Sequence, residues 1–598
     1  MWHRTCNSMG GLRWPGAVSL GAAMVIVVQA CSSSGSGGGA TSAGPGSTPA
    51  STPPAAIARI LASNDLGMHC VDADFSVFSI LPPYNVVHAQ VLVTDATGRP
   101  SLLSGGAVTI SYAPVADALG SINSHSVGKT NFWQYARQIY GANLAPGEGL
   151  KGLYMPADAT SPAQTAFTWS TANGLYMAEG VPIFPVDDAG QLNRYPLMRL
   201  TATDKSTGKA LASLDVVLPV SEETTCSDCH ATGAAAAVAP GISWSGAANL
   251  EVQSRENVLL LHDARIGTSL MASKPVLCAG CHYSAALDLA GTGPSVTQSG
   301  QPTMSAAMHA YHADKMVGSG GSALADHWVT QGGTPPTPVQ QACYACHPGK
   351  TTQCLRGAMT AALTCQNCHG DMHAVGGTAP LRAGGSIDGK NDGPARRPWR
   401  DLPRCQSCHT GDAASHVTLA DASLMATDGI RTLVAFDTTD PAASPRSAPA
   451  SRFAENASTL YRFSKGHGGV GCEGCHNSTH AIWPNPIEAH NDNVAARSLQ
   501  GHSGTIGECV VCHAPGTLPL SLDGPHGMHP TGDPRWAEGG HGDLADANPS
   551  ACTACHGTDF RGTTLSRTAT VRAWNALGTF AQGHVVGCYD CHNGPGGG

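Results

Sequence analysis

The chain has few charged and few aromatic residues for its length of 598. Charged residues make up 13% and aromatic residues 5%, whereas there are 72 glycines and 40 prolines. Such a composition supplies too few large apolar side chains to build a large conventional core. The net charge is −9 and the sequence contains no dense basic patch, which argues against nucleic-acid binding.

Common catalytic signatures are missing as well. The sequence contains neither G-x-S-x-G nor H-E-x-x-H. Residues 384–391 come close to a phosphate-binding P-loop, but they end in Asn391, where that motif needs Ser or Thr. We therefore find no sequence support for hydrolase or nucleotide-dependent chemistry.

Cysteine, in contrast, is plentiful and follows a fixed pattern. Eighteen of the 22 cysteines form nine C-x-x-C-H units, the attachment signature of haem c, in which two thiols form thioethers and the histidine binds iron as the proximal ligand. The units are Cys226/Cys229/His230, Cys278/Cys281/His282, Cys343/Cys346/His347, Cys365/Cys368/His369, Cys405/Cys408/His409, Cys472/Cys475/His476, Cys509/Cys512/His513, Cys552/Cys555/His556 and Cys588/Cys591/His592.

Zinc binding and disulfide bonding are the alternatives for these cysteines. Zinc sites combine CxxC pairs with distant partners, and disulfides do not require a histidine after each pair. We therefore expect nine covalent haems. Each brings a large apolar ring system, so we expect the haems to form the core of the C-terminal two thirds, which should not fold properly without them.

The supply of histidine predicts a second histidine ligand on most irons. Nine of the 27 histidines complete the motifs and His3 lies in the N-terminal segment, which leaves 17 for nine distal positions. Iron with two histidine ligands has no open position for a substrate and transfers electrons. We expect the distal ligands to be His262, His309, His312, His373, His467, His480, His502, His529 and His584, with His327, His416, His490, His526 and His541 in reserve.

Two local patterns guide this choice. A Gly-His pair precedes a haem cysteine by four to seven residues at His467, His502 and His584. His373 and His480 each follow a proximal histidine by four residues, on the same helical face, and we expect them to reach a neighbouring haem. A methionine ligand remains the alternative for at most one site.

The N-terminal segment predicts export. Arg4 and Arg13 precede an apolar run, residues 17–28, that is too short to span a bilayer and is followed by Gln29-Ala30-Cys31. We expect a lipoprotein signal over residues 1–30 with Cys31 as the lipidated residue; an ordinary secretory signal with an incidental cysteine is the alternative. Residues 31–55 are rich in Ser, Gly and Pro and are predicted to be a tether.

The rest of the chain is predicted to be multidomain. Apolar runs at 86–93, 107–112, 166–170 and 211–220, separated by turn signals, predict an all-β, sandwich-like module over residues 56–221. A mainly short-helix and coil region organised around nine haems should follow, as lobe I with haems 1–5 (222–436), a linker (437–459) and lobe II with haems 6–9 (460–598).

Residues 64–74, Asn-Asp-Leu-Gly-Met-His-Cys-Val-Asp-Ala-Asp, are unusual within the β module. His69 could bind a metal ion here, or His69, His88 or His125 could reach a haem. A structural role is the other interpretation, with Cys70 bridged to Cys354 in an oxidising exterior.

The Cys31 segment, the tether and the nine haem motifs together resemble the outer-membrane and extracellular multihaem c-type cytochromes of metal-reducing bacteria, over residues 222–598. The resemblance implies electron transfer at the outer membrane by a lipid-anchored, cell-surface protein, with a periplasmic or extracellular location as the alternative. Its implied partners are periplasmic or porin-associated cytochromes and an extracellular electron acceptor.

Two other functions stay open. Residues 365–373 resemble parts of octahaem cytochromes of the tetrathionate-reductase type, so the protein could reduce a small nitrogen or sulfur oxyanion at one haem with an open position. Nine haems and a β module depart from that family, and the C-x-x-C-K unit of multihaem nitrite reductases is absent. Alternatively, the β module could assemble the chain into a cytochrome filament or complex.

Overall fold

The computed structural model describes residues 57–316 (apart from 66, 162, 223, 225 and 289–291), 461–480 and 493–595 (apart from 575 and 576). Between 317 and 460 it describes residues 343, 344, 346, 347, 365–370, 372, 375, 405, 408, 409, 435 and 452. All of them belong to one compact unit, Pro54–Gly598. The predicted signal segment, Cys31 and nearly all of the predicted linker lie outside the described residues.

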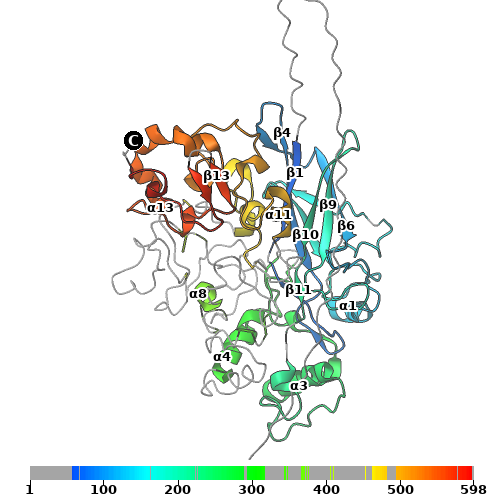
Figure 1. Cartoon of the computed structure of the whole chain (residues 1–598). Coiled ribbons are helices and arrows are strands. Elements are labelled where there is room, and N and C mark those ends of the chain that lie inside the picture. Colours follow the sequence, from blue (N-terminus) through cyan, green and yellow to red (C-terminus); the bar gives the residue numbers. More distant parts are fainter. Residues whose placement is uncertain are drawn as a thin grey trace, which may run out of the picture. The chain divides into compact units, whose positions relative to one another are not determined.

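The N-terminal region is built from two antiparallel sheets (Figure 1). The first has the order β1 (Ile57–Asn64), β4 (Asn85–Thr94), β8 (Leu175–Val181) and β7 (Thr168–Ser170), with β5 (Pro100–Leu102) also on β4. The second has the order β10 (Ala210–Val217), β9 (Leu197–Asp204) and β6 (Val108–Val115). The predicted β-rich N-terminal region is therefore confirmed.

One apolar cluster joins the two sheets. Val87, Ala89 and Val91 of β4 alternate along the strand, and they pack in the same cluster as Ile110 of β6 and Leu200 of β9. Alternate residues of a strand point to one face, so this cluster is formed by the facing sides of both sheets. Strands β1, β8 and β9 were not predicted from the sequence, and β8 contains a glycine and a glutamate that disguise its period.

Helices among the described residues are few and short. The longest is α3 (Leu250–Ile266), whose N-cap Asn249 accepts hydrogen bonds from the backbone N–H groups of Glu251 and Val252 at 2.9 and 3.2 Å, and which ends at Gly267 in the left-handed conformation. The others are α1 (Phe132–Tyr140), α2 (Ser227–His230), α4 (Tyr311–Met316), α8 (Cys365–His369), α10 (Cys472–His476), α11 (Val494–Gln500), α12 (Gly542–Ala547) and α13 (Thr553–His556). In the described part of the chain, no helix is both long and apolar enough to cross a membrane.

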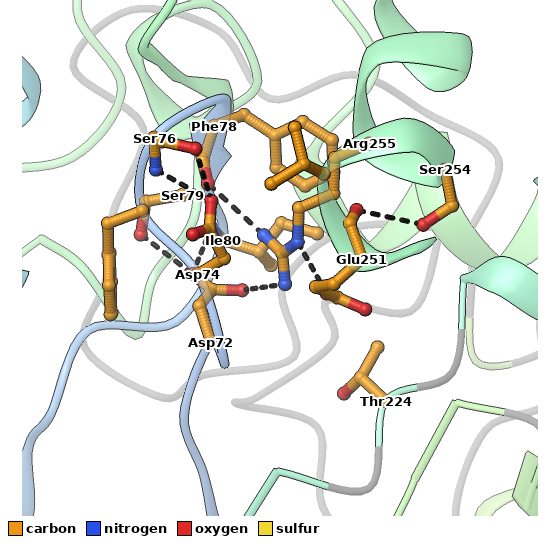
Figure 2. Close-up of polar contacts among 12 residues, drawn as sticks. Asp72, Asp74, Ser76, Phe78, Ser79, Ile80, Thr224, Glu251, Ser254 and Arg255 are labelled. Atoms are coloured by element: carbon orange, nitrogen blue, oxygen red, sulfur yellow. Dashed lines mark hydrogen bonds and ion pairs between the residues drawn. The ribbon is translucent and has the colours of Figure 1, made fainter. Parts of the chain in front are cut away.

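A buried arginine joins the β module to α3 (Figure 2). The Arg255 side chain is 1% exposed and donates to Asp72 Oδ1 at 3.2 Å, to Glu251 Oε1 at 2.6 Å and to the Phe78 carbonyl at 3.1 Å. The second Asp72 oxygen accepts from Ser79 Oγ and from two backbone N–H groups at 2.8–2.9 Å. The loop from Asp72 to Leu81 is thus folded around one carboxylate and one guanidinium.

Small strands strengthen the same connection. β11 (Val220–Ser221) pairs in parallel with β2 (His69–Cys70), and β12 (Val276–Leu277) pairs in parallel with β3 (Phe78–Ser79). The unusual stretch 64–74 therefore lies where the end of the β module meets the chain around the first two haem motifs. Cys354 lies outside the described residues, so its predicted bridge to Cys70 stays a prediction.

The second face of β4 contacts the C-terminal part of the chain. Gln90 donates to the Gly469 carbonyl at 3.1 Å and accepts from Gly471 N–H at 2.8 Å. Thr94 donates to the Cys512 carbonyl at 2.6 Å, and His88 Nδ1 lies 2.9 Å from Glu473 Oε2, both side chains being buried. Strand β4 is therefore buried on both sides, with an apolar side in the core and a polar side against two CxxCH turns.

Gly67 offers a test of this contact. It has φ +90 and pairs with His480, and a Cβ at Gly67 would lie 2.2 Å from the His480 carbonyl oxygen. We expect Gly67→Ala to lower the free energy of unfolding by clearly more than the roughly 1–2 kcal/mol that a left-handed alanine costs. Gly190→Ala is the control, since Gly190 also has a positive φ but open space around it. Equal losses of thermal stability in the two purified proteins would contradict the close contact.

Candidate metal centres

Each CxxCH unit forms a single tight turn. The histidine N–H donates to the carbonyl of the first cysteine at 2.8–3.1 Å in the units ending at His230, His282, His347, His409, His513 and His592. The other three lie in α8, α10 and α13. Because such a turn places residues three and four apart on one face, both sulfurs and the imidazole converge on one side of the turn.

The cysteines of the CxxCH units differ in exposure. Cys281, Cys346 and Cys591 are exposed, whereas the other fifteen are half-buried. Each of the three is the second cysteine of its unit. Cys281 directly follows the short turn Cys278–Gly280, in which Ala279 is the buried residue. Their assignment to haem attachment stays a prediction, as does the expectation that haems form the core of this region.

Among the residues that the structure describes, eight proximal histidines each face a second histidine. The two ring centres lie 5.8–6.4 Å apart in every case. The pairs are His230–His312, His282–His262, His347–His309, His369–His480, His476–His526, His513–His467, His556–His529 and His592–His541. We number the centres 1 to 9 by their proximal histidines in chain order, so the remaining His409 belongs to centre 5.

This spacing fits one metal ion between the rings. An ion bonded to one nitrogen of each imidazole at roughly 2 Å, from opposite sides, holds the ring centres roughly 6 Å apart. At centre 3 the two Nε2 atoms of His309 and His347 face each other at 3.5 Å with the rings nearly parallel, 10° apart. Two histidines on opposite sides are the protein ligands that a haem iron takes, since the porphyrin supplies the other four.

Hydrogen bonds at Nδ1 leave Nε2 available in many of these rings. Nδ1 lies 2.5–2.9 Å from a backbone carbonyl oxygen in His282, His309, His312, His526, His541, His556 and His592. A carbonyl oxygen only accepts, so it fixes the proton on Nδ1 and leaves the lone pair of Nε2 for a metal. In each of these rings, the nitrogen that carries the proton is assigned from its hydrogen-bond partner.

Burial keeps several of these rings neutral. It lowers the pKa of His230 to about 4, with the neighbouring His312 adding to the effect, and lowers the pKa of His529 to about 4 in the same way beside His556. Neutral imidazole is the form that binds a metal ion. The buried rings are thus in the binding form at neutral pH.

Six of the nine expected distal histidines lie against a proximal one: His262, His309, His312, His467, His480 and His529. His373 lies outside the described residues, as do the reserves His327, His416 and His490. At two further centres the proximal ring faces a histidine that was expected only in reserve: His526 at centre 6 and His541 at centre 9.

His502 and His584 lie elsewhere. His502 places Nδ1 2.9 Å from the Ser503 carbonyl and Nε2 3.1 Å from Glu508 Oε1, so both of its nitrogens are engaged. His584 packs on Phe580 and lies 3.2 Å from Asp590 Oδ1. The Gly-His repeat therefore brings only His467 of its three members to a proximal ring.

A second sequence pattern, H-x-x-H, contains distal histidines that the Gly-His repeat does not include. His309 and His312 are three residues apart and face centres 3 and 1, and His526 and His529 are three apart and face centres 6 and 8. Two histidines at this spacing lie near each other but reach different partners. The recurrence of H-x-x-H could have suggested His526 from the sequence.

Shared segments connect most of the centres. His480 follows His476 by four residues yet faces centre 4, and His467 precedes Cys472 yet faces centre 7, so both join their centres to centre 6. Asn257 of α3 donates to the His230 carbonyl at 2.8 Å, and the same helix carries His262 of centre 2.

Cysteine contacts supply the remaining connections. The Cys343 thiol of centre 3 has a raised pKa because it hydrogen-bonds the Cys365 thiol of centre 4. Burial, with Cys408 and Cys405 of centre 5 contributing, raises the pKa of Cys368 to about 12. Each of centres 1 to 8 is therefore close to at least one other.

The three histidines of the β module have other surroundings. His69 Nε2 lies 3.6 Å from Asp65, and His125 Nε2 lies 3.8 Å from Asp188. Burial lowers the pKa of His88, which contacts Glu473 between the two cysteines of centre 6. In the part of the chain that the structure describes, no group of three or more His, Cys, Asp or Glu side chains is arranged to hold a metal ion.

Comparison with known proteins adds no relative. No protein-family model matches the chain, and no curated protein or solved structure matches it either. The functional assignment therefore depends on the residues themselves.

Proposed function

We propose that this protein is a nonahaem c-type cytochrome that carries electrons along closely spaced haems, most of them held by two histidines. The observation that carries the proposal is the spacing of the eight histidine pairs, each of which contains the histidine of a CxxCH unit. A haem bound at such a pair supplies reversible one-electron chemistry at its iron.

The chain itself contributes attachment, orientation and spacing. The two cysteines of each unit are the attachment points, and the carbonyl partners of Nδ1 hold the imidazoles in the orientation that Nε2 ligation needs. Two histidines per iron leave no position for a substrate, which favours electron transfer over oxyanion reduction. The shared H-x-x-H segments favour a continuous series of centres, because each pair of ligands three residues apart keeps two irons close together.

The proposal includes the location. Residues 1–30 act as the export signal that haem attachment requires, Cys31 carries the lipid, and the tether lets the haem-bearing body stand away from the outer membrane. Other redox proteins then supply electrons from the periplasm or from a porin, and an extracellular acceptor takes them.

The deciding experiment is an electron paramagnetic resonance (EPR) spectrum of the purified ferric protein, with its covalent haem content counted on the same sample. We expect nine haems per chain and low-spin signals from at least the eight paired centres. A stoichiometric high-spin signal that responds to nitrite, hydroxylamine or sulfite would instead favour the reductase. A chain that retains zinc or disulfides and no haem would overturn the proposal.

A further inference from the structure

Trp536 lies between the distal ligands of two neighbouring centres. Its indole is stacked on the His529 ring of centre 8. The two ring centroids lie 4.3 Å apart, and the ring planes are 7° apart. The His541 ring of centre 9 lies 5.7 Å away on a 32° tilt, and its Nδ1 is 2.7 Å from the backbone carbonyl of Trp536. One residue therefore touches both rings, through its side chain and its backbone respectively.

The two rings are held in different ways. His541 has the carbonyl partner at Nδ1 that fixes its tautomer and its plane, as many of the other ligand rings do. Nδ1 of His529 is buried without a hydrogen-bond partner of normal geometry among the described residues, although a weak hydrogen bond to the Pro530 backbone raises its pKa slightly against the effect of burial. The flat face of Trp536, stacked at 4.3 Å, is thus a close contact that can fix the plane of the His529 ring.

We propose that Trp536 is a positioning residue for two haem centres: its indole orients His529 at centre 8, and its carbonyl orients His541 at centre 9. The inference rests on the proposed function, because it assigns these histidines to iron. Stacked aromatic rings resist rotation about the Cβ–Cγ bond. Loss of a hydrogen-bonding partner of a ligating histidine weakens metal binding about 10- to 100-fold, and we expect loss of the stack to act at the lower end of that range.

Side-chain substitutions separate the two roles. Trp536→Ala removes the stack on His529 and the looser 5.7 Å ring contact with His541, but it keeps the backbone carbonyl that serves His541, so we expect the larger change at centre 8. Trp536→Phe restores a flat ring, and Trp536→Leu restores bulk without one. Trp574→Ala is the matched control, because Trp574 packs on Phe580 in the same part of the chain and not on a ligand ring.

The measurement is carbon monoxide binding by the reduced, fully haem-loaded protein, together with ferric EPR. In Trp536→Ala we expect about one haem per chain to bind carbon monoxide with at least tenfold higher affinity than in the unaltered protein. One low-spin signal should broaden or shift. Trp536→Phe and Trp574→Ala should behave like the unaltered protein, and Trp536→Leu like Trp536→Ala.

The outcomes distinguish this inference from the proposed function. Unchanged binding and spectra in Trp536→Ala, with all haems present, would overturn the role of Trp536 alone. If Trp536→Ala fails to fold, Trp536→Leu decides, because behaviour like the unaltered protein would mean that only bulk matters. Absence of low-spin haem in the unaltered protein would overturn the proposed function before any variant is compared.

Discussion

Replacing His526 by alanine should convert one low-spin iron of the haem-loaded protein into a high-spin iron. His526 faces His476 with ring centres 5.8 Å apart, and its Nδ1 is held by the Arg452 carbonyl at 2.7 Å, so its Nε2 is the atom available to the metal at centre 6. Alanine leaves that position open. The change should be visible as a stoichiometric high-spin EPR signal and as carbon monoxide binding to one reduced haem.

His502→Ala is the matched control, since His502 lies in the same part of the chain and its sequence pattern made it the preferred candidate, ahead of His526. Its nitrogens are engaged by Glu508 and by the Ser503 carbonyl, and we expect every iron to stay low-spin in this variant. His541→Ala and His584→Ala repeat the comparison at centre 9. A high-spin signal in His502→Ala with none in His526→Ala would reverse the assignment.

Replacing Arg255 by methionine should cost about 3–5 kcal/mol of stability, the usual penalty for leaving one charge of a buried pair without its partner. The Arg255 and Asp72 side chains are only 1% and 4% exposed, and Phe78 also packs on the guanidinium, 4.7 Å from its ring centre. Loss of the guanidinium would leave the Asp72 carboxylate buried and would free the loop that joins the β module to α3. Denaturant unfolding of the purified protein, followed by circular dichroism, measures the effect.

Two further variants test this interpretation. Arg265→Met removes an exposed arginine from the same helix, whose guanidinium lies 5.8 Å from the Tyr311 ring centre, and we expect a loss of at most about 1 kcal/mol. Asp72→Asn combined with Arg255→Met removes both charges, and it should recover part of the loss because no uncompensated charge stays buried. If Arg255→Met were no less stable than Arg265→Met, the pair would not be holding the module in place.

Local chemistry made the CxxCH turns predictable. C-x-x-C-H is a pattern of residues three and four apart, and such residues share one face of a turn whatever the rest of the chain does. The same holds for a strand with a clear alternation such as β6, whose buried residues follow a period of two. How deeply each turn is buried does not follow from the motif, and Cys281 at the surface is an example.

The polar side of β4 could not be anticipated in this way. Its His88, Gln90 and Thr94 contact Glu473, Gly471 and Cys512, more than 380 residues further along. The Arg255–Asp72 pair likewise joins residues 183 apart in the chain. No local pattern specifies such partners, because they depend on how whole segments pack.

The histidine pairs also depend partly on the sequence and partly on the tertiary structure. The order of the residues alone shows that nine histidines follow cysteine pairs. It also shows that more than enough other histidines exist to face them. That His526 and His541 face proximal rings while His502 and His584 do not was decided by tertiary structure alone. A proximal ligand is set by covalent neighbours, whereas a distal ligand is whichever imidazole the folded chain brings to the opposite side, roughly 6 Å away.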